Sequence, residues 1–287
     1  MNFRDFYQPG KIDFSFETFP PKDEAGVTGL FEALKELAPF RPAFISVTYG
    51  AGGSTRDLTR DLAVRIHREL HLTTAFHFTC VGADRLAIRS YVEHLKKEGL
   101  NLIVALRGDP PKGETKFVKP ADGFLYATEL VRYLKEIDGF SIAVAGYPEG
   151  HVEAKSKKED LIHLKEKVDS GADIVITQLF FDNADYFDFA ARAKKIGITV
   201  PIIPGILPVL NLKQLTRITS MSGAKIPDDL RLELEACGED NDKMREVGIR
   251  WATRQCRDLV DKGAPGIHFY ILNRAYSTRR IIENLQK

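Results

Sequence analysis

Residues 140–180 read FSIAVAGYPEGHVEAKSKKEDLIHLKEKVDSGADIVITQLF, and this stretch decides the fold. It begins and ends with short apolar runs of the kind that form strands, at residues 140–147 and 173–180. A polar loop and a longer segment with helical character lie between the two runs. A strand, a helix and a second strand in this order predict a parallel βαβ unit.

The same pattern extends in both directions along the chain. Six more apolar runs are strand candidates: 12–17, 43–49, 74–80, 101–107, 200–206 and 266–272. Eight strands that alternate with helices in 287 residues predict an α/β fold, the closed (β/α)8 or TIM barrel. A doubly wound open sheet is the alternative fold.

Local signals support the helices between the strands. Ser54 and Asp57 fit a capping box before a helix over residues 58–70. After the fourth strand, apolar side chains recur at helical spacing: Leu125, Leu130, Val131 and Leu134. Residues 219–247 look like extra helices between strands seven and eight. With no linker visible, we expect one domain over residues 1–287.

Composition limits the classes of function. The 41 basic and 40 acidic residues nearly cancel, whereas a nucleic-acid partner normally requires a basic excess. The three cysteines form no CxxC pair, which suits a reducing compartment. The N-terminus has no signal-peptide pattern, and no apolar run approaches the length of a membrane span. We therefore expect a cytoplasmic protein without nucleic-acid or membrane partners.

Polar residues recur where the predicted strands end. In a barrel, the carboxyl ends of the strands form the mouth at which active sites lie. A purely structural barrel would not need such side chains there. They are Glu17, Thr48, Tyr49, His77, Thr79, Arg107, Gly108, Asp109, Tyr147, Thr177, Gln178, Asn273 and Arg274.

Glu17 is the most informative of these residues. Side chains alternate between the two faces of a strand, so Phe14 and Phe16 share one face and Ser15 and Glu17 share the other. The phenylalanines suit the helix side, which leaves Glu17 facing the barrel axis. Desolvation there predicts a raised pKa and a carboxyl group able to donate a proton. The alternative is a Glu at a strand end that meets only water or an arginine.

The other candidates also have ordinary structural explanations. His77 alone suits a hydrogen-bonded core histidine, and residues 107–111 suit a surface turn. Residues 50–55 lead into a helix N-terminus but match no phosphate-binding motif, so that signal is weak. Asp160, His163 and Lys167 share one helix face, which could simply be solvated. No spacing predicts a metal site.

Eight motifs in register make the chain resemble a known family. In order they are FETFPP, SVTYGAGGST, HFTC, ALRGDPP, YPEGHVEAKS, ITQLFFD, PGILPV and HFYILNR. Together, over about residues 12–285, they closely resemble bacterial-type methylenetetrahydrofolate reductases. The resemblance implies a (β/α)8 barrel that carries FAD. It also implies that NADH or NADPH reduces 5,10-methylenetetrahydrofolate to 5-methyltetrahydrofolate in a ping-pong cycle.

The resemblance also implies catalytic roles for two carboxylates. Glu17 matches the general acid of the family, which protonates N10 so that the folate ring opens to an iminium cation at N5. Asp109 matches an aspartate beside the flavin and the pterin. Its charge would stabilise that cation and tune the flavin.

Further binding residues follow from the resemblance alone. Gln178, Gln214 and Arg274 would contact the folate or the pyridine nucleotide, and Thr48 would lie near the nicotinamide. The implied FAD contacts, with Asp109 beside the flavin, are Tyr49, Ala51, His77, Arg107, Gly108, Tyr126, Ala127, Tyr147, His151, Ala154, Asp160, His163 and Lys167. Family precedent implies a homo-oligomer and no metal, and the sequence leaves NADH or NADPH open.

Some residues depart from the family pattern, and other functions remain to be weighed. His163, Glu166 and Ile218 stand where the best-known bacterial members have other residue types, which affects FAD and nucleotide binding rather than chemistry. A cofactor-free barrel lyase would need a Schiff-base lysine at a strand end, and the sequence has none there. A folate- or flavin-binding subunit without activity would not need Glu17.

Overall fold

The computed structural model describes residues 1–7, 12–49, 56–109 and 119–287. In this part of the chain nine parallel strands form one sheet in the order β7-β6-β5-β4-β3-β2-β1-β9-β8. They are β1 (Asp13–Thr18), β2 (Ile45–Val47), β3 (Thr74–Thr79), β4 (Leu102–Leu106), β5 (Ser141–Gly146), β6 (Ile174–Thr177), β7 (Ile202–Ile203), β8 (Gly205–Ile206) and β9 (Gly266–Tyr270).

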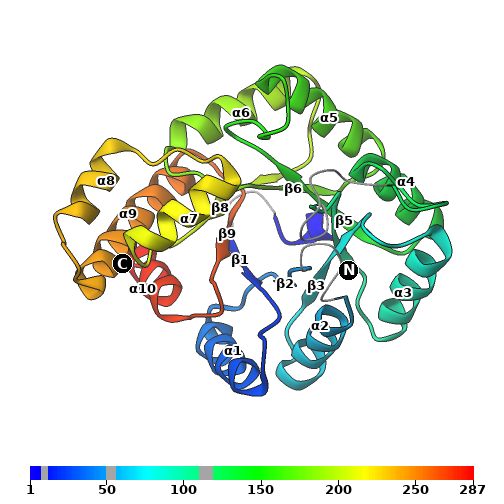
Figure 1. The fold of residues 1–287 in the computed structure, drawn as a ribbon, viewed down its shortest axis with the longest axis horizontal. Helices are drawn as coiled ribbons and strands as arrows, with labels where there is room; N and C mark the ends of the chain where they lie inside the picture. Colours follow the sequence, from blue (N-terminus) through cyan, green and yellow to red (C-terminus); the bar gives the residue numbers. More distant parts are fainter. Residues whose placement is uncertain (8–11, 50–55, 110–118) are drawn as a thin grey trace.

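The sheet closes into a barrel at its seventh strand. Only Pro204 separates β7, which pairs with β6, from β8, which pairs with β9, so the two ends of the sheet meet (Figure 1). Proline has no N–H to donate to a ladder, and its carbonyl accepts the His268 N–H at 2.9 Å. The run predicted as one strand over 200–206 is therefore two short strands, and the (β/α)8 barrel is confirmed.

Helices surround this barrel (Figure 1). In the described part of the chain, six of them begin after an Asp, Asn or Ser whose side chain accepts a backbone N–H: Asp23, Asp84, Ser156, Asp182, Asn211 and Asp240. The helices are α1 (Glu24–Leu37), α2 (Arg56–Leu70), α3 (Arg85–Lys97), α4 (Ala127–Ile137), α5 (Lys157–Asp169), α6 (Asn183–Lys195), α7 (Leu212–Ser222), α8 (Asp228–Glu235), α9 (Asn241–Asp261) and α10 (Tyr276–Leu285), with 3₁₀ turns η1 (Phe3–Asp5) and η2 (Ala38–Phe40).

Two local predictions need comment. Leu125 does not belong to α4, because its N–H donates to the Glu129 carboxylate at 2.7 Å before the helix begins at Ala127. Leu130, Val131 and Leu134 do form its buried face. The capping box predicted at Ser54 lies outside the described residues.

The extra helices before the last strand are confirmed, with wider limits than 219–247. α7 begins earlier, and α9 continues to Asp261. Their apolar side chains form a cluster of their own with Leu207 and Val209, which follow β8. These helices therefore pack onto the carboxyl end of the seventh strand.

The core has one layer on each face of the sheet. Phe16 is fully buried among helix residues such as Leu30 and Leu34, which confirms that the phenylalanine face of β1 points outward. Inside the barrel, Phe3 from η1 packs edge-on against Phe44 at 5.0 Å between ring centroids. The N-terminal turn thus closes one end of the barrel and leaves the polar side chains at the other.

Candidate active site

Glu17 faces two histidines inside the barrel. Its Oε2 lies 3.3 Å from His77 Nε2 and 3.5 Å from His268 Nε2. The Glu17 side chain is 19% exposed, whereas those of the histidines are 8% and 0% exposed. The predicted inward orientation of Glu17 is confirmed, and its partners are imidazoles rather than water or an arginine.

A chain of hydrogen bonds continues from this cluster toward the closed end of the barrel. His268 Nδ1 lies 2.8 Å from Ser15 Oγ, which lies 3.3 Å from the Tyr7 hydroxyl. If Nε2 of His268 carries the proton toward Glu17, Nδ1 accepts from Ser15. His268 was not among the residues predicted from the sequence. Side chains alternate between the two faces of the strand GIHFY (266–270), which places His268 and Tyr270 opposite Ile267 and Phe269, and this alternation could have identified His268.

The prediction that the Glu17 pKa is raised is wrong for the protein alone. Burial favours a raised pKa, but the charge on protonated His77 and hydrogen bonds from His268 and His77 outweigh burial. Together they lower the pKa of Glu17 from its usual 4.5 to about 2. The carboxyl of Glu17 is therefore ionised in the protein alone.

A second charged group lies where β4 ends. Both terminal nitrogens of Arg107 donate to the Glu153 carboxylate, at 2.6 and 2.9 Å. Gly108 has φ +86°, and a Cβ there would lie 2.8 Å from Thr79 Cβ, so a larger residue would not fit. Asp109 is exposed, and its charge acts on Arg107. No hydrogen bond or ion pair joins Asp109 to Glu17 among the described residues.

The loop after β5 and the start of α5 form the third group. The Tyr147 ring packs edge-on against the His151 ring at 4.6 Å, and burial raises the pKa of Tyr147 to about 12. Lys167 Nζ donates to the Ala145 carbonyl at 2.6 Å, and burial lowers its pKa to about 8 despite the attraction of Asp160. Burial in turn raises the pKa of Asp160. A partly buried cation thus lies beside β5.

The remaining cofactor candidates are spread around this mouth. Thr48 and Tyr49 follow β2. Tyr126 is the N-cap of α4, which begins at Ala127, and the Ala154 N–H donates to the His151 carbonyl. Tyr126 is 57% exposed. Ala51 lies outside the described residues.

The His163 side chain is 60% exposed and lies 3.3 Å from Glu166, on the same helix as the partly buried Lys167. Of the helix face predicted from Asp160, His163 and Lys167, only Asp160 and Lys167 are partly buried. Glu166 therefore contacts His163 rather than Lys167.

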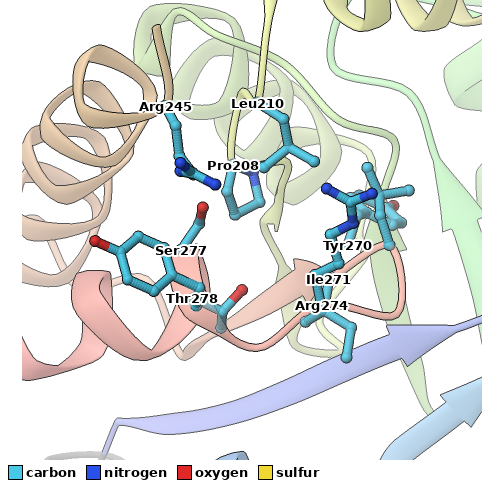
Figure 2. Close-up of a pocket in the computed structure, with 10 residues that line it drawn as sticks. Pro208, Leu210, Arg245, Tyr270, Ile271, Arg274, Ser277 and Thr278 are labelled. Atoms are coloured by element: carbon cyan, nitrogen blue, oxygen red, sulfur yellow. The ribbon is translucent and has the colours of Figure 1, made fainter. Parts of the chain in front are cut away.

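The substrate candidates lie at the ends of the last strands. Gln178 follows β6, and its side-chain oxygen accepts the Leu179 N–H at 2.9 Å. Gln214 lies in the first turn of α7, where its oxygen accepts the Leu210 N–H at 3.3 Å. Both amide groups keep their NH2 donors for a ligand. Arg274 follows β9 and lines a small cavity (Figure 2).

Metal-binding clusters and membrane-spanning helices are both absent from the described residues. No group of three or more His, Cys, Asp or Glu side chains there is arranged to hold a metal ion. No helix there has both the length and the apolar character needed to cross a membrane.

Comparison with known proteins places this geometry in a family. A family model described as methylenetetrahydrofolate reductase matches residues 2–286. This chain belongs to the methylenetetrahydrofolate reductase family. A "5,10-methylenetetrahydrofolate reductase" from Salmonella typhimurium is 41% identical over 96% of this chain and 91% of that protein.

Longer proteins of the family also match this chain. "Methylenetetrahydrofolate reductase (NADH) 1" from Arabidopsis thaliana is 39% identical over 97% of this chain but only 49% of that protein. The chain thus spans about half the length of the plant relatives it matches. Among solved structures, an uncharacterized protein from Clostridium thermocellum that binds two copies of 5-methyl-5,6,7,8-tetrahydrofolic acid superposes with a TM-score of 0.64. It is 13% identical over 96% of this chain and 94% of that one, which shows a shared fold.

Proposed function

We propose that this chain reduces 5,10-methylenetetrahydrofolate to 5-methyltetrahydrofolate with NADH or NADPH, in a single barrel domain that carries FAD. Membership of the family supports the reaction. The observation that carries the proposal is the carboxyl of Glu17, enclosed by two imidazoles at the mouth of the barrel. A barrel that only bound a ligand would have no need of a proton reservoir there.

The residues present fit a dinucleotide such as FAD. Its pyrophosphate is a dianion, and Lys167 is a partly buried cation whose ammonium donates to the Ala145 carbonyl. Arg107 already presents its donors in the bidentate geometry that suits phosphate, on Glu153. When bound, FAD supplies the hydride-carrying chemistry of a ping-pong cycle, in which NAD(P)H reduces it and the folate reoxidises it.

Glu17 would deliver the proton that opens the folate ring. The methylene bridge becomes a good hydride acceptor only after N10 is protonated and a cationic iminium forms at N5. A folate over the mouth excludes water from Glu17, and this desolvation raises the pKa of the carboxyl. Glu17 can then take up a proton and donate it to N10.

Other side chains would orient and stabilise the folate. The charge of Asp109 at the end of β4 would favour the iminium cation. The free NH2 of Gln178 would donate to an acceptor on the pterin edge, and Thr48 would lie near the nicotinamide. The homo-oligomer implied by the resemblance stays a prediction.

One titration tests this function. The absorbance of the purified protein, with FAD added back if needed, is followed without oxygen as NADH, NADPH and then methylenetetrahydrofolate are added. We expect a flavin spectrum that bleaches with a nucleotide and returns with the folate. A protein that binds no FAD, or whose reduced flavin ignores the folate, would contradict the proposal.

The same titration on Glu17→Gln tests whether Glu17 is the general acid. Bleaching by the nucleotide should persist, whereas reoxidation by the folate should slow by about 100-fold or more, the usual contribution of a general acid. Glu32→Gln, an exposed glutamate of α1, is the matched control and should behave as the wild type. If both half-reactions slowed equally in Glu17→Gln, Glu17 would not be the acid.

A further inference from the structure

The loop that follows β5 is joined to the end of α7, far along the chain. The Glu149 carboxylate accepts the backbone N–H of Lys225, 76 residues away, with both oxygens, at 3.1 and 3.2 Å. Two residues before Lys225, the backbone of Gly223 lies so close to the same loop that a Cβ there would be 2.6 Å from Val152 Cγ1. These two contacts attach the end of α7 to residues 149–152.

The surroundings of Glu149 make its contact with Lys225 important to both partners. The Glu149 side chain is partly buried, and burial raises its pKa, an effect that the hydrogen bond from the Lys225 N–H opposes. A partly buried carboxylate is costly without donors, and a backbone N–H at the end of a helix likewise needs a partner. Each group satisfies the other, so the contact stabilises this arrangement of loop and helix.

α7 itself has a small buried face. Of its 11 residues only Leu215 and Thr219 are buried, whereas α3 buries four of 13. Leu215 packs with Leu230 of α8 and Val247 of α9, in the cluster of the appended helices, and Figure 1 shows α7 beside these two helices. Because few apolar contacts fix α7, the hydrogen bonds at its ends contribute much to its placement.

The joined segments both carry candidate ligand residues. Gln214 lies in the first turn of α7, where the Asn211 side chain accepts its backbone N–H at 2.8 Å. The loop after β5 carries Tyr147 and His151, whose rings pack edge-on and which are two of the implied FAD contacts. A helix of this length is a stiff rod of roughly 16 Å. Displacement of the end that Glu149 holds therefore also displaces Gln214.

We propose that Glu149 is a positioning residue, which ties α7 to the loop that would bind FAD and so places Gln214 for the folate. The inference rests on the proposed function. FAD in its site orders the loop after β5, the loop orders α7, and the folate meets an amide donor already in place. By thermodynamic linkage, FAD binding and folate binding then favour each other through this contact.

The test follows both half-reactions of FAD-loaded protein by anaerobic stopped-flow absorbance. In Glu149→Ala, the methylenetetrahydrofolate concentration that gives half-maximal flavin reoxidation should rise about tenfold, as the loss of a charge-assisted hydrogen bond allows. The limiting rate of reoxidation and the bleaching rate at saturating nucleotide should stay those of the wild type. Glu149→Gln keeps an acceptor oxygen, so that concentration should rise by about threefold or less.

Two further variants separate positioning from a general loss of stability. Asp5→Ala removes a carboxylate that also accepts a backbone N–H, from Asn2 at 2.9 Å, but at the closed end of the barrel, and should keep the wild-type kinetics. Gln214→Ala should raise the half-saturating folate concentration, and adding Glu149→Ala should raise it no further, because residues that act through one another are not additive. Additive effects, or a loss in Glu149→Ala confined to the limiting rate, would overturn the proposal.

Hydrogen exchange measures the same coupling without turnover. FAD should slow amide exchange in α7 of the wild type and should not slow it in Glu149→Ala. Equal slowing in the two proteins would overturn the coupling. If FAD slows exchange only in the wild type but the folate never reoxidises the flavin, the link between loop and helix stands and the proposed function fails. If FAD does not bind, both fail together.

Discussion

The carboxyl group of Glu17 lies between two imidazoles, whose charge and hydrogen bonds together outweigh the effect of its burial. Because burial acts on the same carboxyl in the opposite direction, the balance changes when a ligand excludes more water. A carboxyl of this kind can be ionised in the free protein and still donate a proton in a complex. Its direct neighbours, His77 and His268, therefore belong to the proposed acid as much as Glu17 does.

At the same scale, the pKa of Lys167 predicts how FAD affinity depends on pH. Its pKa in the free protein is about 8, and a pyrophosphate favours the protonated ammonium. FAD affinity should thus be constant below pH 8 and should fall as pH rises above it, because binding must then restore a proton. Equilibrium dialysis of FAD between pH 7 and 9.5 measures this fall.

Two substitutions in α5 test the assignment of Lys167 to the FAD site. Lys167→Ala should weaken FAD binding by about tenfold and remove the pH dependence, since the charge-assisted contact is lost. Lys158→Ala, an exposed lysine of the same helix, should keep the wild-type profile. A profile unchanged in Lys167→Ala would exclude Lys167 from the FAD site.

At the scale of elements, the helices appended after β8 pack closely against the segment that follows this strand. α9 approaches the loop after β8 so closely that a Cβ on Gly248 would lie 2.1 Å from the Val209 carbonyl oxygen. Gly248→Ala must therefore displace α9, and we expect a loss of about 1–3 kcal/mol in the free energy of unfolding. Urea denaturation measures it.

Gly29 in α1 is the matched control for Gly248. It is also helical, but a Cβ there meets nothing within 4 Å. Gly29→Ala should stabilise the protein by about 0.5–1 kcal/mol, the helix-propensity difference alone. Equal effects of the two substitutions would contradict the close packing of α9.

At the scale of the whole molecule, the barrel is closed at one end and carries the polar side chains of the candidate site at the other. Phe3 is fully buried and holds η1 in the closed end, where its N–H donates to Ser141 Oγ at 2.9 Å. Phe3→Ala should lower the free energy of unfolding by about 3–5 kcal/mol, the usual result of removing a core aromatic ring. FAD and folate affinities of the folded variant should remain those of the wild type, because the ring lies away from the mouth.

Phe19, which is 42% exposed, provides the comparison for this measurement. Phe19→Ala should change stability by about 0.5 kcal/mol or less. If Phe3→Ala proved equally mild in urea denaturation, the N-terminal turn would not be part of the barrel core.

Much of this architecture could be predicted from local pattern. The alternation of strands and helices predicts the barrel, and the alternation of Phe14, Ser15, Phe16 and Glu17 predicts which side chains face inward, because both depend on near neighbours in the chain. The split at Pro204 was missed although the proline is visible, because its effect depends on whether a neighbouring strand needs its N–H. Leu125 was misplaced because its N–H donates to the Glu129 side chain, and the helix begins two residues later than spacing alone suggests.

The sequence by itself determined the fold, the family and the polar ring at the strand ends, since each is a matter of residue type and spacing. Only the tertiary structure decided that His77 and His268 flank Glu17 and that Glu153 holds Arg107. Those facts depend on distances between residues far apart in the chain. Electrostatic interactions vary with such distances and with burial, and for that reason the direction of the Glu17 pKa could not be predicted from the strand that carries it.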